Sequence, residues 1–131
     1  MFIDRLNAEE QQALFQLLTS VAWADGKLEQ QEVKFLEQYA NTYEIEAMAD
    51  TEINVEDSCK MFPSHLSKVV ALQELVKISL CDGHYDDAEK SGATVIADYF
   101  GISREALSNV ESWVREGLEW TKSGELLLSA S

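Results

Sequence analysis

Along most of the chain, hydrophobic residues recur every three to four positions, which is the period of an amphipathic helix. The first apolar stripe has the i, i+3, i+4, i+7 spacing of one helical face and consists of Leu14, Leu17, Leu18 and Val21. Asn7, three residues before Glu10, has the spacing of a capping box and predicts where this helix begins. Asp25-Gly26 predicts its end, because glycine readily takes the left-handed conformation that closes helices.

The same reasoning predicts further helices, bounded by Asn, Ser or Asp at their starts and by Gly or Pro after their ends. They are expected at about residues 29–42, 54–61, 66–81, 86–99 and 103–122. In the second, Val33, Leu36 and Ala40 are expected to face inward. In the last, the inward stripe includes either Trp113 or Val114, and beyond it Leu126 to Leu128 are a frayed tail or dock back on the bundle.

Residues 66–81 differ from the other segments because apolar side chains fall on every side of the predicted helix. A helix without a polar face belongs in the centre of a bundle. One proline and six glycines in 131 residues leave little punctuation for strands and turns. We therefore expect a single all-α domain over residues 1–131, a compact bundle of about six to seven helices.

The chain contains an internal repeat with a shift of 57 residues. It aligns residues 15–45 with residues 72–102, with 46–65 as the linker, and each copy shows the pattern helix, Asp-Gly turn, helix. Identical residues in the two copies include Leu18 and Leu75, and Ala40 and Ala97. The repeat predicts two helical hairpins related by a pseudo-twofold axis.

Each copy carries Asp-Gly followed by Glu at the sixth position after the glycine, in DGKLEQQE and DGHYDDAE. This is the spacing of the second half of an EF-hand calcium loop. The first half is missing, because the positions that should supply oxygen ligands hold Val21 and Trp23 in one copy and Ile78 and Leu80 in the other. The missing oxygen ligands therefore exclude an EF-hand in either copy.

The two half-motifs could still act together. If the twofold axis brings the turns together, Asp25, Glu32, Asp82 and Glu89 form a cluster of four carboxylates, with Glu29, Asp86 and Asp87 at its rim. Such a cluster needs a cation or protons to offset its repulsion, and oxygen ligands suit calcium, magnesium or manganese. The same residues can instead be caps and turn residues that bond the backbone, or a polar surface for a partner.

The repeat with these residues resembles the TerB-like family, which includes the tellurite-resistance protein TerB and the N-terminal domain of the co-chaperone DjlA. The likeness lies in AWADGKLEQQEVKFLEQYA and LCDGHYDDAEKSGATVIADYFGIS and covers residues 8–118 in outline. It implies a bundle of about seven helices built from two repeats and a candidate metal site at Asp25, Glu32, Asp82 and Glu89. The chain departs from the family pattern at Trp23, where a small residue is usual.

Charge narrows the function classes. Asp and Glu number 24 against 10 Lys and Arg, which makes the net charge −14 and disfavours nucleic acids and anionic membranes as partners.

The remaining sequence features concern location and chemistry. Cys59 and Cys81 lack zinc-site spacing, and the start of the chain shows no signal-peptide core, so we expect a cytoplasmic protein. No nucleophile–base pairing is readable, which predicts a protein that is not an enzyme. Two hypotheses remain: a stress-related protein that responds to divalent cations, and an interaction module whose acidic face docks a protein partner.

Overall fold

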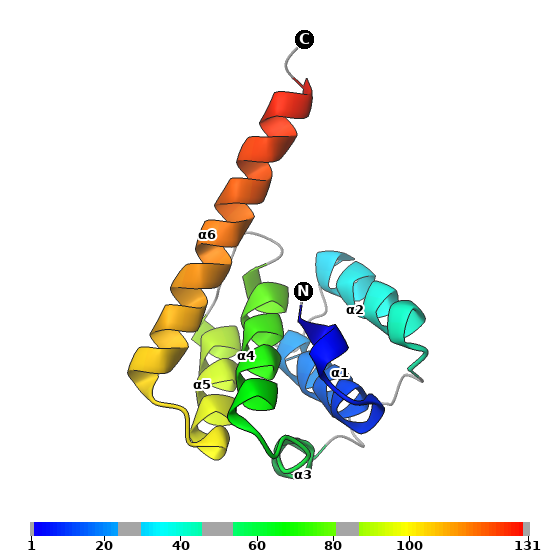
Figure 1. The fold of residues 1–131 in the computed structure, drawn as a ribbon, viewed down its shortest axis with the longest axis vertical. Helices are drawn as coiled ribbons and strands as arrows, with labels where there is room; N and C mark the ends of the chain where they lie inside the picture. The colour runs from blue at the N-terminus through cyan, green and yellow to red at the C-terminus, as the bar shows by residue number, and fades with distance from the viewer. Residues whose placement is uncertain (1, 24–29, 46–53, 81–86, 130–131) are drawn as a thin grey trace.

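A computed structural model describes residues 2–23, 30–45, 54–80 and 87–129. These residues form a short 3₁₀ helix, Ile3–Arg5, and six α-helices, which are α1 Ala8–Ala22, α2 Gln30–Tyr43, α3 Val55–Cys59, α4 His65–Leu80, α5 Asp87–Phe100 and α6 Arg104–Ser129. No strand occurs within those ranges. The expectation of an all-α bundle of about six helices is confirmed (Figure 1).

The helix starts follow the capping residues. Asn7 accepts a 2.8 Å hydrogen bond from the Glu10 amide, while the Glu10 carboxylate accepts one from the Asn7 amide, which completes the capping box of α1. Asn54 caps α3 through the amide of Asp57, and the Ser103 hydroxyl accepts from the amide of Ala106 in α6. These local bonds explain why the starts could be predicted from sequence.

α4 lies at the centre of the fold. It packs against α1, α2, α5, α6 and the 3₁₀ helix. Leu72, Leu75, Val76 and Ile78 have no exposed surface, as expected for a helix without a polar face. Leu66, in its first turn, is the exception among the apolar residues of this segment, because it is 45% exposed.

The two repeat copies correspond to the helix pairs α1–α2 and α4–α5. Positions 57 residues apart are buried in both copies, as at Leu18 and Leu75 and at Val21 and Ile78. The Asp-Gly turns at 25–26 and 82–83 lie outside the described residues, so their expected superposition stays a prediction.

The second helix of each copy also ends in the same way. The Ile45 amide donates to the Ala40 carbonyl and the Ile102 amide donates to the Ala97 carbonyl, both at 2.9 Å. The residue before each isoleucine has a positive φ, 55° at Glu44 and 72° at Gly101. This is the Schellman closure, in which the backbone turns left-handed after the last helical residue.

The positive-φ residues of the two closures, Glu44 and Gly101, predict substitutions with opposite effects on the free energy of unfolding. Gly101→Ala should lower the free energy of unfolding by about 1 kcal/mol, because a Cβ is unfavourable at positive φ. Glu44→Gly should raise it by roughly 0.5 kcal/mol, since it removes that strain from the first copy. Urea unfolding of both variants measures the pair, and changes of the same sign would contradict the shared closure.

Several boundaries differ from expectation for local reasons. α3 ends at Cys59 rather than Met61, because the chain tightens after Cys59 and the Met61 amide donates to the Ser58 carbonyl three residues back.

Two helices bury a different face, or extend further, than expected. The buried face of α2 runs through Glu32, Leu36 and Tyr39, while Val33 and Ala40 are half-buried. α6 continues to Ser129 instead of ending near residue 122, and Leu126 to Leu128 are exposed rather than docked. In α6, Val114 rather than Trp113 completes the inward stripe.

Candidate functional site

The predicted carboxylate cluster falls mostly outside the described residues. Asp25 and Asp82, with Glu29 and Asp86 of the rim, lie in the stretches 24–29 and 81–86. Asp87 and Glu89 belong to the first turn of α5, but their side chains are outside the description. Among the side chains that the structure does describe, no group of three or more metal-ligating residues occurs. The convergence of the four carboxylates therefore stays a prediction.

Glu32 is the one member of that cluster whose side chain is described. It lies in the first turn of α2 and is only 2% exposed. It shares the buried face of α2 with Leu36 and Tyr39. Negative charge is favoured at a helix N-terminus, so this burial fits either a capping role or a ligand role.

A groove between α4 and α6 is the feature that sequence analysis did not anticipate. Its volume is about 290 Å³. Apolar parts of the side chains on α6 form one wall, and polar or charged residues of α4 form the other. The lining residues are Gln73, Glu74, Lys77, Trp113, Val114, Gly117, Leu118 and Thr121. The α4 and α6 helices that line it lie side by side (Figure 1). Its last lining residue, Thr121, belongs to the exposed part of α6.

Aromatic contacts support two of the lining side chains. The Trp113 indole stacks on Phe2, with ring centroids 6.0 Å apart. The Lys77 ammonium lies 5.7 Å from the centre of the Phe35 ring on α2, at cation–π distance. Both lining residues are therefore held by neighbours from other parts of the chain.

Glu74 brings a carboxylate into the interior next to the tyrosines of α2. It is 2% exposed. Burial, followed by the charge of Glu74 and the neighbouring Tyr43, raises the pKa of Tyr39 well above its usual range. Tyr39 thus stays protonated at physiological pH and donates a 2.7 Å hydrogen bond to the carbonyl of Gln11. Glu74 is the only acidic residue of α4, in a segment with apolar side chains on every side, and this was the sequence signal for the buried acid.

The remaining candidates from sequence have structural roles or lie outside the description. Cys59 is a buried free thiol, and burial together with nearby Glu56 raises its pKa to about 11, which makes it unreactive at neutral pH. Cys81 and His84 lie outside the described residues, and His65 is exposed at the start of α4. No described helix is long and apolar enough to cross a membrane.

Comparison of the chain with models of known families, with curated proteins and with solved structures gives no match.

Proposed function

We propose that this chain is a non-enzymatic protein–protein interaction module that docks a basic amphipathic helix of its partner in the α4–α6 groove. The observation that carries the proposal is the groove itself, whose α6 wall holds Trp113, Val114 and Leu118 and whose α4 wall holds Gln73, Glu74 and Lys77. The apolar wall accepts the apolar face of the helix, and the net charge of the whole chain, rather than the groove lining, favours a basic partner. Apolar grooves between helices accept the apolar face of a partner helix. The resemblance to the DjlA N-terminal domain supports the same class of function.

The charge of the chain selects the kind of partner. With a net charge of −14, the protein attracts cationic segments of a partner and repels anionic ones. A helix with leucines on one face and lysines on the other fits both requirements. Its leucines pack in the apolar groove, and its lysines are attracted by the negative charge of the chain. Rising salt should weaken such a complex because it screens the long-range attraction.

Calorimetric titration with a synthetic leucine–lysine amphipathic helix tests this proposal. Thr121→Arg places a cation and a long side chain at the groove wall and should weaken peptide binding by about tenfold or more. Ser123→Arg makes the same change in net charge at an exposed position that does not line the groove, and should change affinity much less. Equal losses in the two variants would show bulk electrostatic attraction without groove docking and would overturn the proposal.

A second candidate function, that of a cation-responsive stress protein of the TerB type, draws on Glu32. Glu32 is 2% exposed in the first turn of α2, and a buried carboxylate is stabilised by a partner such as a backbone N–H or a cation. The ions that oxygen ligands favour are calcium, magnesium and manganese. The tellurite-resistance resemblance supports this candidate, and the shared Asp-Gly…Glu spacing of the two copies supplies the other three residues.

Titration with these three cations distinguishes the ligand role from the capping role. If the site exists, wild-type protein binds one of them saturably, and a concentration about 100 times the dissociation constant adds roughly 2.7 kcal/mol to the free energy of unfolding. Glu32→Gln should weaken that response, whereas Glu37→Gln, an exposed position on the same helix, should leave it unchanged. Glutamine also serves in a capping box, so a pure cap predicts little effect of Glu32→Gln in either condition.

A further inference from the structure

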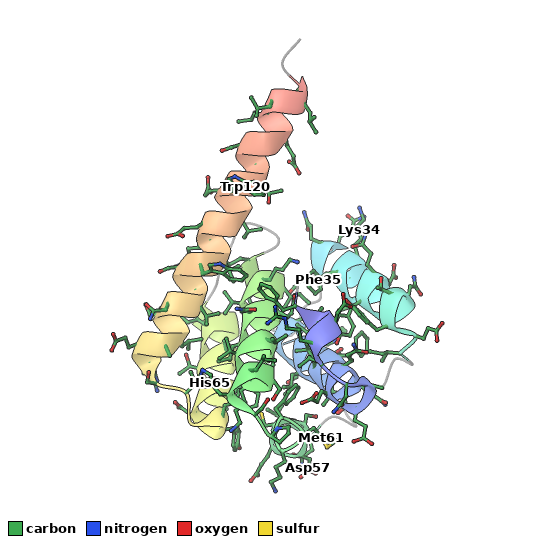
Figure 2. The ribbon with its side chains drawn as sticks, in the orientation of Figure 1. Lys34, Phe35, Asp57, Met61, His65 and Trp120 are labelled. Atoms are coloured by element: carbon green, nitrogen blue, oxygen red, sulfur yellow. The ribbon has the colours of Figure 1, made fainter. Side chains whose placement is uncertain are left out.

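The last three turns of α6, from Glu119 to Ser129, contribute no buried residue to the bundle. Val114 is the last buried residue of this helix, and every residue from Glu119 to Ser129 is exposed. Figure 1 shows this segment extending away from the other helices, and Figure 2 places Trp120 on it. Trp120 is 80% exposed and Leu127 is 77% exposed. Large apolar side chains in this setting indicate a surface that is covered by another molecule.

Large and small residues alternate along this helix with the spacing of a coiled-coil seam. Successive steps of four, three, four and three residues connect the members, which gives the average period of 3.5 on which two helices supercoil. We call this set the Trp–Gly stripe, and it consists of Trp113, Gly117, Trp120, Gly124 and Leu127.

The glycines of the stripe have no structural reason within the monomer. A Cβ at Gly117 or Gly124 would meet no atom within 4 Å, and neither residue has the positive φ that favours glycine. Glycine inside a helix is nevertheless less stable than alanine. Their position between large exposed residues is explained if another helix approaches closely and its large side chains fill the space above them.

We propose that the Trp–Gly stripe binds a second copy of this chain, with the two α6 helices antiparallel. In that orientation a large residue of one helix faces a small residue of the other. Trp120 packs over the second copy's Gly124, and Leu127 packs over the second copy's Gly117. Because the same patch serves on both sides, the contact is closed and twofold symmetric.

Charge along the helix allows this pairing despite the acidity of the whole chain. From Arg115 to Ser129 there are two basic and three acidic residues, so the segment carries 2 − 3 = −1, against −14 for the chain. The antiparallel orientation also places the two acidic bundles at opposite ends of the helix pair. Remaining repulsion between them is screened by salt, so higher ionic strength should strengthen the dimer.

The available apolar area sets the expected strength. The large exposed side chains on the stripe and next to it are Trp113 (39% exposed), Trp120 (80%), Leu127 (77%) and the adjacent Leu128 (87%). With about 150–250 Å² for an aromatic side chain and roughly 100 Å² for a leucine, each copy contributes roughly 340–460 Å². Two copies then bury roughly 700–900 Å², below the roughly 1,200–2,000 Å² of stable specific interfaces, which predicts a weak dimer that dissociates on dilution.

Sedimentation velocity of the full chain over a wide range of protein concentrations tests the proposal. We expect a reversible monomer–dimer equilibrium that shifts toward dimer as potassium chloride is raised. Trp120→Ala should weaken the dimer by about tenfold or more, as expected for a tryptophan at the centre of an interface. Leu126→Ala is the matched control, because Leu126 is 69% exposed but lies off the stripe, and it should change the dimer much less.

Gly124→Leu provides the sharper variant. It adds apolar surface and favours the helix, so any non-specific association would increase. The stripe predicts the opposite, because the leucine occupies the space that the second copy's Trp120 fills. Circular dichroism checks that each variant keeps its helix content. Wild-type protein that stays monomeric at every concentration, equal effects of Trp120→Ala and Leu126→Ala, or tighter association of Gly124→Leu would each overturn the proposal.

The stripe and the groove share Trp113 and Gly117, so a second copy and a basic helix compete for this part of α6. The two proposals still fail separately, because their test variants lie at residues that the surfaces do not share. Thr121 lines the groove but is not in the stripe, while Trp120 and Gly124 are in the stripe but do not line the groove. Salt should also act in opposite directions, weakening the basic peptide complex and strengthening the dimer.

Discussion

Leu75→Ala is expected to lower the free energy of unfolding by about 2–5 kcal/mol. Leu75 has no exposed surface and lies on α4, the helix that packs against α1, α2, α5 and α6. Alanine at this position leaves a cavity in the close-packed interior, which the surrounding structure can close only in part by relaxing. Leu72→Ala, also fully buried on α4, should have a loss in the same range.

Urea unfolding followed by circular dichroism measures this loss. The matched control is Leu66→Ala, the same substitution in the first turn of the same helix at a side chain that is 45% exposed. There we expect a loss of about 0.5 kcal/mol, the usual scale for a surface position. A loss this small at Leu75 would contradict the central position of α4.

Phe62→Ala is expected to cost about 3–5 kcal/mol. Phe62 is 2% exposed and follows α3, in the connection that leads to Pro63 and the start of α4. Its ring meets the edge of Phe100 at the end of α5, with centroids 5.5 Å apart. The substitution therefore removes both the buried area of a large aromatic side chain and its contact with the second repeat.

The neighbouring Met61 supplies the control for this experiment. Met61 is 40% exposed, so Met61→Ala should change the free energy of unfolding by less than about 1 kcal/mol. Comparable losses in the two variants would show that this connection is not anchored by the Phe62 side chain.

The sequence predicted those features that depend on neighbours along the chain. Asn7, Asn54 and Ser103 cap helices where their spacing indicated, because a cap is a bond between residues three apart. Gly101 ends α5 in the left-handed conformation for the same local reason. The apolar surroundings of α4 were also readable, since a helix with no polar face can only be stable in the interior.

The predicted inward residues of a helix were wrong where contacts with a neighbouring helix set its buried face. The buried face of α2 includes Glu32 and Tyr39 instead of Val33 and Ala40. Tyr39 is held inward by its bond to Gln11 of α1 and by stacking on Phe15, with ring centroids 5.7 Å apart. Both contacts join residues distant along the chain, so periodicity alone placed the inward face one position away.

The candidate sites divide in the same way. The repeat, the Asp-Gly…Glu spacing and the excess of carboxylates could be read from the chain, because they are properties of residue order and composition. The groove between α4 and α6 and the exposure of Trp120 became visible only in the folded chain. A groove and an exposed face depend on which helices lie nearby and which do not. A pattern along one helix shows the residues on a face, but only packing decides whether another helix covers that face.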